Sequence, residues 1–316
     1  MRSTVYHSGV HLEGRHLRPA ESKCPLCSFG GERSAFLSLQ SEPEVTLLAC
    51  PNCGGFSASR LPTEEALREY YAKYYEQDTF QGAGKVTFHK PNNFARHLVS
   101  KAKPFLNRPS LRILDFGGGD GNLSIATAQL LLEGGASHVH INLVDYNSVL
   151  ARVDNRAISF EYHENLVSAG AMDCDLVLAS AILEHIPYPQ EDFTRLLSAL
   201  RAGGVFYART PCVASLFRTL QRIGLSVDFT FPAHVHDMGE GYWSNVLSLL
   251  PPAFQGYSLI WSHPSPVESS LRKDPLRTVA AHVLKAPWRI FRKHYQFVGG
   301  WEVLIRRPSE GSIEKG

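Results

Sequence analysis

The stretch that decides the fold is Ile113-Leu114-Asp115-Phe116-Gly117-Gly118-Gly119-Asp120-Gly121-Asn122-Leu123-Ser124. The mainly apolar run over 111–114 predicts a buried strand that ends at Asp115. Glycines then occupy alternate positions, and a helix is expected to begin near Asn122. The loop glycines are Gly117, Gly119 and Gly121. A strand, a glycine loop and a helix in this order bring backbone N–H groups close to a nucleotide-like ligand.

A second predicted strand, over 138–144, ends at Asp145, which lies 24 residues beyond Gly121 (145 − 121). In nucleotide-binding α/β folds, an acidic residue at this point accepts hydrogen bonds from the ribose hydroxyls. The spacing is not that of a dinucleotide site, because Asn122 stands where the third glycine of that motif falls. The sequence therefore predicts a nucleoside site of another kind.

The motifs resemble those of the class I S-adenosylmethionine (SAM)-dependent methyltransferases. The matching segments follow in order over roughly 95–260, and they are 115–121, Asp145, 173–187 and 201–207. The resemblance implies an α/β fold, a Rossmann-like, doubly wound and mostly parallel seven-stranded sheet, with SAM as cofactor. The cofactor-binding residues it implies are Asp115, Gly117, Gly119, Gly121, Asp145, Tyr146, Glu164 (or its neighbour Asn165) and Ser180.

Two Cys-x-x-Cys pairs lie ahead of this region, separated by 22 residues (50 − 27 − 1). The four cysteines are Cys24, Cys27, Cys50 and Cys53. Four thiolates on two turns suit tetrahedral zinc, and a closed set of four favours a structural Zn²⁺ ion. Two disulfides or a redox pair are the alternatives; a cytosolic chain argues against the first, and a redox pair needs no twin. We expect a small zinc-ribbon-like module.

Three histidines are candidates for catalysis, because a hydroxyl acceptor needs a base to take its proton. His185 follows the predicted fourth strand at the carboxyl edge of the sheet. His234 and His236 share one face of an extended segment, and Asp237 can orient an imidazole. A metal site at this cluster and a purely structural loop are the alternatives.

Composition and charge limit the kinds of protein that this chain can be. The chain has 316 residues, 44% of them hydrophobic, and a formal net charge of +2, so it forms a sizeable core and lacks a strong nucleic-acid footprint. No apolar run reaches a membrane span, and the N-terminus does not resemble a signal peptide, so we expect a cytoplasmic protein. The C-terminal segment mixes basic and apolar residues, which suits a helix packed on the core or a peripheral contact with the inner membrane face or a lipid-linked glycan.

The predicted organisation has five parts. They are a loose lead-in (1–20), the zinc-binding module (21–60), a helical linker or lid (61–108), the SAM-binding core (109–265) and a basic helix with the final strand of the sheet (266–316). A zinc module ahead of such a core resembles bacterial sugar and glycan methyltransferases. The expected reaction is methyl transfer to a small-molecule acceptor, most simply a hydroxyl of a saccharide, nucleotide sugar or surface-glycan precursor. The alternatives are a nucleic-acid methyltransferase, a sugar C-methyltransferase and a non-catalytic SAM-binding protein; no nucleic-acid partner is expected, since the zinc module is not basic.

Overall fold

The structure is a computed structural model that describes residues 9–76, 91–146, 151, 153–169, 172–225, 227–267, 275–292 and 295–309. Its strands are β1 (Ser34–Ser41), β2 (Glu44–Ala49), β3 (Phe56–Ala58), β4 (Ser110–Phe116), β5 (His138–Val144), β6 (Ile158–His163), β7 (Cys174–Ser180), β8 (Leu200–Cys212), β9 (His236–Asp237), β10 (Ser258–Pro264) and β11 (Gly299–Arg306). Its α-helices are α1 (Glu64–Glu76), α3 (Pro91–Ala102), α4 (Asn122–Glu133), α5 (Leu166–Ala169), α6 (Pro189–Ser198), α7 (Ala214–Arg222), α8 (Glu240–Asn245), α9 (Pro275–Lys285) and α10 (Trp288–Phe291). The 3-10 helices are η1 (Gly14–His16), η3 (Lys103–Phe105), η4 (Leu183–His185), η5 (Val246–Leu249) and η6 (Pro252–Phe254).

The larger sheet has seven strands in the order β10-β11-β8-β7-β4-β5-β6. The pairs among β8, β7, β4, β5 and β6 are parallel, whereas β11 runs antiparallel to both β8 and β10. The chain moves outward from β4 to β6 and then returns to place β7 on the other side of β4. This reversal is the topological switch point at which open α/β sheets bind ligands, beyond the carboxyl ends of the strands. The predicted mostly parallel, seven-stranded sheet is confirmed.

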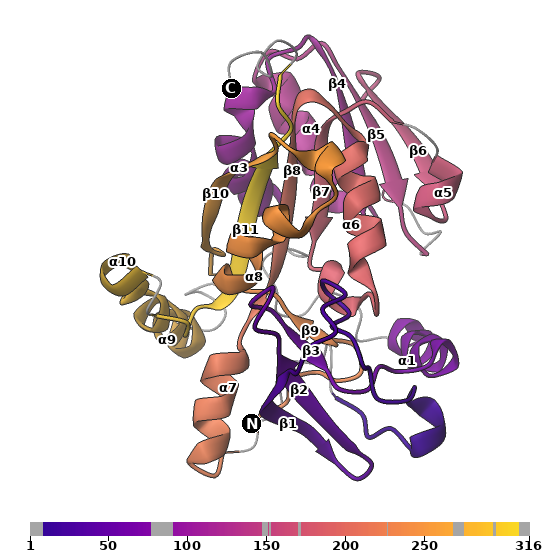
Figure 1. Ribbon diagram of the computed structural model, residues 1–316. Coiled ribbons are helices and arrows are strands. Elements are labelled where there is room, and N and C mark those ends of the chain that lie inside the picture. The colour runs from indigo at the N-terminus through magenta and orange to yellow at the C-terminus, as the bar shows by residue number, and fades with distance from the viewer. Residues whose placement is uncertain are drawn as a thin grey trace.

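Successive residues of the central strands enter opposite cores, as the two-residue period of a strand requires. Ile113 and Leu178 join a cluster with α3 and α4, whereas Leu114 and Val177 join a cluster with α6 and α8. Helices therefore cover both faces of the sheet (Figure 1). Because both faces are covered, these strands read as nearly continuous apolar runs in the sequence.

The N-terminal module is a second sheet, in the order β1-β2-β3-β9 (Figure 1). Its last strand, β9, comes from a segment far along the chain, with Ser57 paired to His236. The first twenty residues are not loose over the part that the structure describes, since Leu12 and Leu17 are each 5% exposed and pack with Val235. These contacts bury apolar side chains that a sequence read segment by segment leaves without a partner. Residues 1–8 of the predicted lead-in lie outside the described residues.

The helix predicted after Thr63 is α1, and the Thr63 hydroxyl caps it by accepting the Ala66 N–H at 3.2 Å. The rest of the predicted linker or lid lies partly outside the described residues, which resume at α3. At the C-terminus, α9 and α10 precede the predicted final strand, β11.

The apolar side chains of α9 and α10 do not all pack on the core. More than half of the surface is exposed for Leu276, Val279, Val283, Ile290 and Phe291. Packing of the whole apolar face was one of the two expectations for this segment, and it is not met at these positions. Contact with a membrane surface stays a prediction. Among the described residues, no helix has the length and apolar character needed to span a bilayer.

Candidate active site

The loop after β4 has the backbone of a ligand cradle. Its three glycines adopt the left-handed conformation that favours glycine, with φ of 68° at Gly117, 63° at Gly119 and 82° at Gly121. A Cβ on Gly117 would lie 2.4 Å from Ile182, which follows β7. A Cβ on Gly119 would have no atom within 4 Å. The loop is thus packed against the β7 side and open at Gly119, beside the first turn of α4, whose N–H groups point toward this edge.

The other predicted cofactor residues lie along the same edge, at the carboxyl ends of neighbouring parallel strands. Asp145 follows β5, and its Oδ2 accepts a hydrogen bond from the Gly119 N–H at 2.7 Å. Tyr146, next to it, is 93% exposed. Glu164 is exposed just beyond β6, and Ser180 ends β7. Residues from four strands are therefore brought to one edge, as the resemblance implied.

Two buried polar atoms at this edge indicate the chemistry of the ligand that this edge suits. Within the part of the chain that the structure describes, Asp115 Oδ2 and Ser180 Oγ are buried without a hydrogen-bond partner. Burial raises the pKa of Asp115 to about 7. A hydrogen bond with Ser124 opposes this rise, and the nearby Asp145 carboxylate adds to it. A buried carboxyl of this kind favours a cationic ligand, which would restore its charged form. SAM carries an ammonium and a sulfonium, so the residues present fit that cofactor.

A second group of polar side chains gathers a few residues beyond β7. Glu184 and His185 belong to η4, and His234 belongs to the loop that leads into β9. The two imidazole rings are 4.8 Å apart, and His185 Nε2 lies 3.9 Å from Glu184 Oε1. The Nδ1 of His185 lies 2.9 Å from the Ala233 carbonyl oxygen and 3.2 Å from the Tyr71 hydroxyl of α1. We call Glu184, His185 and His234 the His–Glu cluster.

The sequence of residues 88–238 matches the profile of a family described as "Methyltransferase domain". The matched segment contains the glycine loop, the whole cofactor edge and the His–Glu cluster. The protein is a methyltransferase. No curated protein matches the chain in sequence.

Solved structures similar to this methyltransferase include other methyltransferases at low identity. The magnesium protoporphyrin IX methyltransferase of Synechocystis PCC 6803 with bound SAH is 15% identical, covering 78% of this chain and 100% of that one, at a TM-score of 0.48. The plantazolicin methyltransferase BpumL in complex with SAH is 13% identical, covering 78% and 91%, at a TM-score of 0.47. A sarcosine dimethylglycine methyltransferase described as putative, from Galdieria sulphuraria, is 17% identical, covering 78% and 99%, at 0.40. These likenesses do not identify an acceptor.

The other two predicted catalytic residues lie inside the methyltransferase and hold its loops. His236 is fully buried, and its Nε2 lies 2.9 Å and 3.1 Å from the carbonyl oxygens of Ile186 and Pro187. Asp237 Oδ2 accepts the backbone N–H groups of Val213 and Ala214, at the start of α7. The structure therefore does not bring His236 and Asp237 into the His–Glu cluster. It places His236 where it ties the loop after η4 to the loop that carries His234.

Two members of the site were not predicted from the sequence. Glu184 lies in the matching segment 173–187, and the available signal was a carboxylate directly before His185 at the carboxyl end of a strand. Tyr71 belongs to a tyrosine-rich helix that reads as packing. Its contact with His185 spans 114 residues of sequence, and no local pattern marks it.

The four cysteines of the two Cys-x-x-Cys pairs are brought together. Their sulfur atoms all lie within 4.8 Å of one another, with 3.9 Å between Cys24 and Cys53 and 3.7 Å between Cys27 and Cys50. A tetrahedral Zn²⁺ with bonds of about 2.3 Å separates its sulfur ligands by about 3.8 Å. Burial raises the pKa of Cys27 to about 11, whereas hydrogen bonding from Cys53 lowers that of Cys24 to about 5. Thiols this close do not all ionise without a cation, so the cluster fits zinc.

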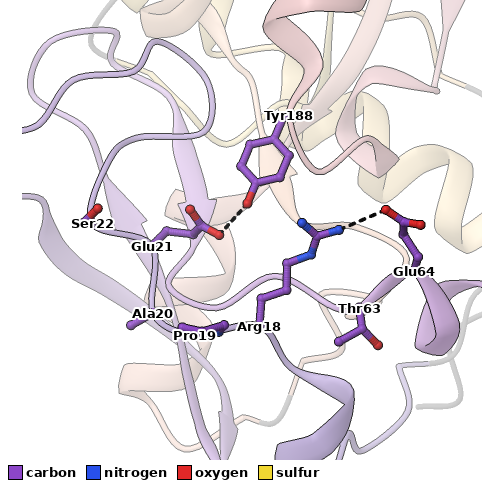
Figure 2. A pocket seen from close by; sticks show the side chains of 8 residues that line it. All are labelled: Arg18, Pro19, Ala20, Glu21, Ser22, Thr63, Glu64 and Tyr188. Carbon is purple, nitrogen blue, oxygen red and sulfur yellow. Dashed lines mark hydrogen bonds and ion pairs between the residues drawn. The ribbon is translucent and has the colours of Figure 1, made fainter.

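A surface hollow of about 580 Å³ lies where the N-terminal segment, the start of α1 and Tyr188 meet, and Figure 2 shows the side chains that line it. The Tyr188 hydroxyl donates to Glu21 Oε1 at 2.7 Å, and Arg18 pairs with Glu64 at 3.4 Å. The hollow shares no residue with the cofactor edge or the His–Glu cluster. The Tyr188–Glu21 hydrogen bond joins the cysteine-bearing N-terminal module to the core, so we assign the hollow to that junction and not to the acceptor.

Proposed function

We propose that the protein transfers the methyl group of SAM to a hydroxyl oxygen of a small-molecule acceptor, most simply a saccharide or a sugar-containing precursor. The observation that carries this proposal is the His–Glu cluster, placed just beyond β7 at the cofactor edge. The loop that bears it is also the loop that touches the glycine cradle, since Ile182 packs over Gly117. An acceptor bound at the cluster is thus close to the cofactor edge.

Methyl transfer to a hydroxyl has three requirements. The carbon–sulfur bond breaks with its electron pair left on sulfur, a carbon–oxygen bond forms, and the hydroxyl proton leaves. SAM supplies the electrophilic methyl group when it is bound. The chain must align the acceptor and receive the proton.

The contacts of His185 suit it to receive that proton. The Ala233 carbonyl oxygen only accepts hydrogen bonds, so the proton of the neutral ring lies on Nδ1 and the lone pair on Nε2. A proton taken by Nε2 is stabilised by the Glu184 carboxylate, 3.9 Å away and 2% exposed. Tyr71 and His234 supply further polar groups of the kind that bind hydroxyls.

We also propose that the cysteine cluster holds one structural Zn²⁺. Support comes from the sulfur–sulfur distances and from backbone N–H groups that point at the sulfurs, from Leu26 to Cys24, Phe29 to Cys27 and Gly55 to Cys53. Such groups stabilise the negative charge of a zinc-bound thiolate. Four protein ligands leave no open position, which suits a structural ion.

The test is transfer of label from methyl-labelled SAM, with purified protein and an extract of a host that lacks this gene. We expect label in small saccharides or nucleotide sugars, as a methyl ether by NMR, and loss of most of it in His185→Gln. The matched control is His138→Gln, at the amino end of β5, on the opposite edge of the sheet. Label in RNA, in protein or on carbon contradicts the proposal. Binding of SAM without transfer in any fraction favours a non-catalytic protein.

A further inference from the structure

The His–Glu cluster offers three donor atoms of types that bind divalent cations. The donor atoms of Glu184, His185 and His234 all lie within 4.8 Å of one another. One carboxylate and two imidazoles form a mixed oxygen and nitrogen set, which suits first-row divalent metals and leaves positions open for a ligand. The cysteine cluster differs from it in both chemistry and position, because it is all sulfur and lies in the N-terminal module.

The orientation of His185 is that of a metal ligand. A ligating histidine commonly donates its second ring N–H to a backbone carbonyl, which fixes the tautomer and aims the other nitrogen. Here Nδ1 faces the Ala233 carbonyl oxygen at 2.9 Å, and Nε2 is the atom that faces Glu184. The lone pair of Nε2 and the carboxylate oxygen are both acceptors, and they lie 3.9 Å apart. A metal ion placed between these two acceptors is stabilised by both of them.

The donor atoms lie within 4.8 Å of one another and have to move closer together to bind one cation. A cation at about 2.1 Å from each ligand places neighbouring donor atoms about 3 Å apart. The Nε2–Oε1 distance therefore has to close by about 1 Å, which side-chain rotation accomplishes.

The backbone around the cluster is held from outside. His236 joins β9 to the carbonyl groups of Ile186 and Pro187, directly after η4. The Val235 N–H donates to the Glu184 carbonyl oxygen at 3.0 Å. These bonds fix the loop of His234 against the loop of Glu184 and His185. Ligands held in place before the cation arrives lose less conformational entropy on binding it.

We propose that Glu184, His185 and His234 bind a first-row divalent cation, which presents open coordination positions to oxygen atoms of the methyl acceptor. This inference rests on the proposed function for its purpose and replaces one step of it, because Nε2 of His185 cannot bind the cation and receive the proton at the same time. A cation at this place lowers the pKa of a hydroxyl that reaches it, and the proton then leaves to water instead of to His185. The acceptor class narrows to molecules with a hydroxyl and a second oxygen close by, as in a vicinal diol of a sugar.

The test is Mn²⁺ binding to the full chain with its zinc in place and no acceptor. Binding is measured as a decrease of the EPR signal of free Mn²⁺. We expect one Mn²⁺ per chain. Glu184→Gln and His234→Gln each weaken binding by about 10-fold or more, and His138→Gln leaves it unchanged. Thermal melts without Mn²⁺ show whether each variant is folded. If a ligand variant does not fold, pulsed EPR of the wild-type complex decides, because imidazole ligands give a nitrogen coupling.

No saturable Mn²⁺ binding, equal binding by wild type and Glu184→Gln, or a complex without nitrogen coupling overturns the inference. Its failure is distinct from that of the proposed function. Methyl transfer that persists in a chelator, with the zinc content unchanged, leaves the function standing and removes the cation. Mn²⁺ binding with no labelled acceptor leaves the cation site standing and contradicts the proposed function.

Discussion

Replacing Asp115 with Asn is expected to stabilise the ligand-free protein and to weaken its hold on SAM. Asp115 is 2% exposed, and burial raises its pKa from 3.8 to about 7. Because the pKa of this carboxyl is raised in the folded state, binding of its proton stabilises the fold. That stabilisation is complete below pH 4 and is lost as the pH rises toward 7. A rise from 3.8 to about 7 corresponds to a cost of about 4 kcal/mol at pH 8 and about 2 kcal/mol at pH 5.

Asn carries no charge at either pH, but it leaves an amide N–H₂ group where Asp115 Oδ2 now lacks a partner. An unsatisfied buried donor costs about 1–2 kcal/mol. The net gain in the free energy of unfolding is therefore about 2–3 kcal/mol at pH 8 and close to zero at pH 5. At roughly 2 °C per kcal/mol for a large domain, Tm rises by about 4–6 °C at pH 8 only.

The assay is thermal unfolding of wild type and Asp115→Asn without cofactor at both pH values, with calorimetric titration of SAM at pH 8. Loss of a carboxylate facing a cationic ligand weakens binding by about 10- to 100-fold. The matched control is Asp120→Asn, in the same loop but only partly buried. If the variant is less stable at pH 8, or if its Tm rises equally at both pH values, Asp115 is not a destabilising buried carboxyl that favours a cationic ligand. Unchanged SAM affinity refutes its part in the cofactor site.

Three further outcomes are expected. Cys53→Ser lowers the zinc content measured by metal analysis from about one ion per chain to well below it and lowers Tm, whereas Cys212→Ser, outside the cluster, keeps the zinc. Gly119→Ala costs about 1–2 kcal/mol of stability, because it requires a left-handed backbone, and it weakens SAM binding more than stability, since its Cβ points into open space; an unchanged Kd argues against this loop as the cradle. His236→Ala leaves two carbonyl groups without their donor and lowers the free energy of unfolding by about 2–4 kcal/mol, together with methyl transfer; lost transfer at an unchanged Tm shows instead that His236 acts in catalysis.

The sheet was predictable because its information is local. Apolar runs such as 111–114 and the glycines after Asp115 mark a buried strand that turns into a helix, and parallel strands place their carboxyl ends together. The positions of Asp145 and Ser180 at one edge followed from that rule. The cysteine spacing likewise indicated that four sulfurs meet.

The rest depended on contacts between distant segments. His234 and His236 look alike in the sequence, but one joins the His–Glu cluster and the other is fully buried against backbone carbonyls. Only the packing of the loop after η4 separates them. The burial of Leu12 and Leu17 was missed, and the sequence left packing and surface exposure of the α9 apolar residues open, for a similar reason: periodicity identifies a face and not what covers it.

The pairing of Ser57 with His236 also constrains how the chain matures during synthesis. About 180 residues separate the two partners (236 − 57), and ribosomes add about 5–20 residues per second. The N-terminal sheet therefore waits roughly 10 to 35 seconds on the ribosome for its fourth strand. During this interval the four cysteines are already synthesised while one edge of their module is unpaired. With the proposed zinc site, the growing chain is therefore expected to bind its metal before the fold is complete, and a fragment ending before residue 236 is expected to bind zinc while exposing an unpaired strand edge that promotes aggregation.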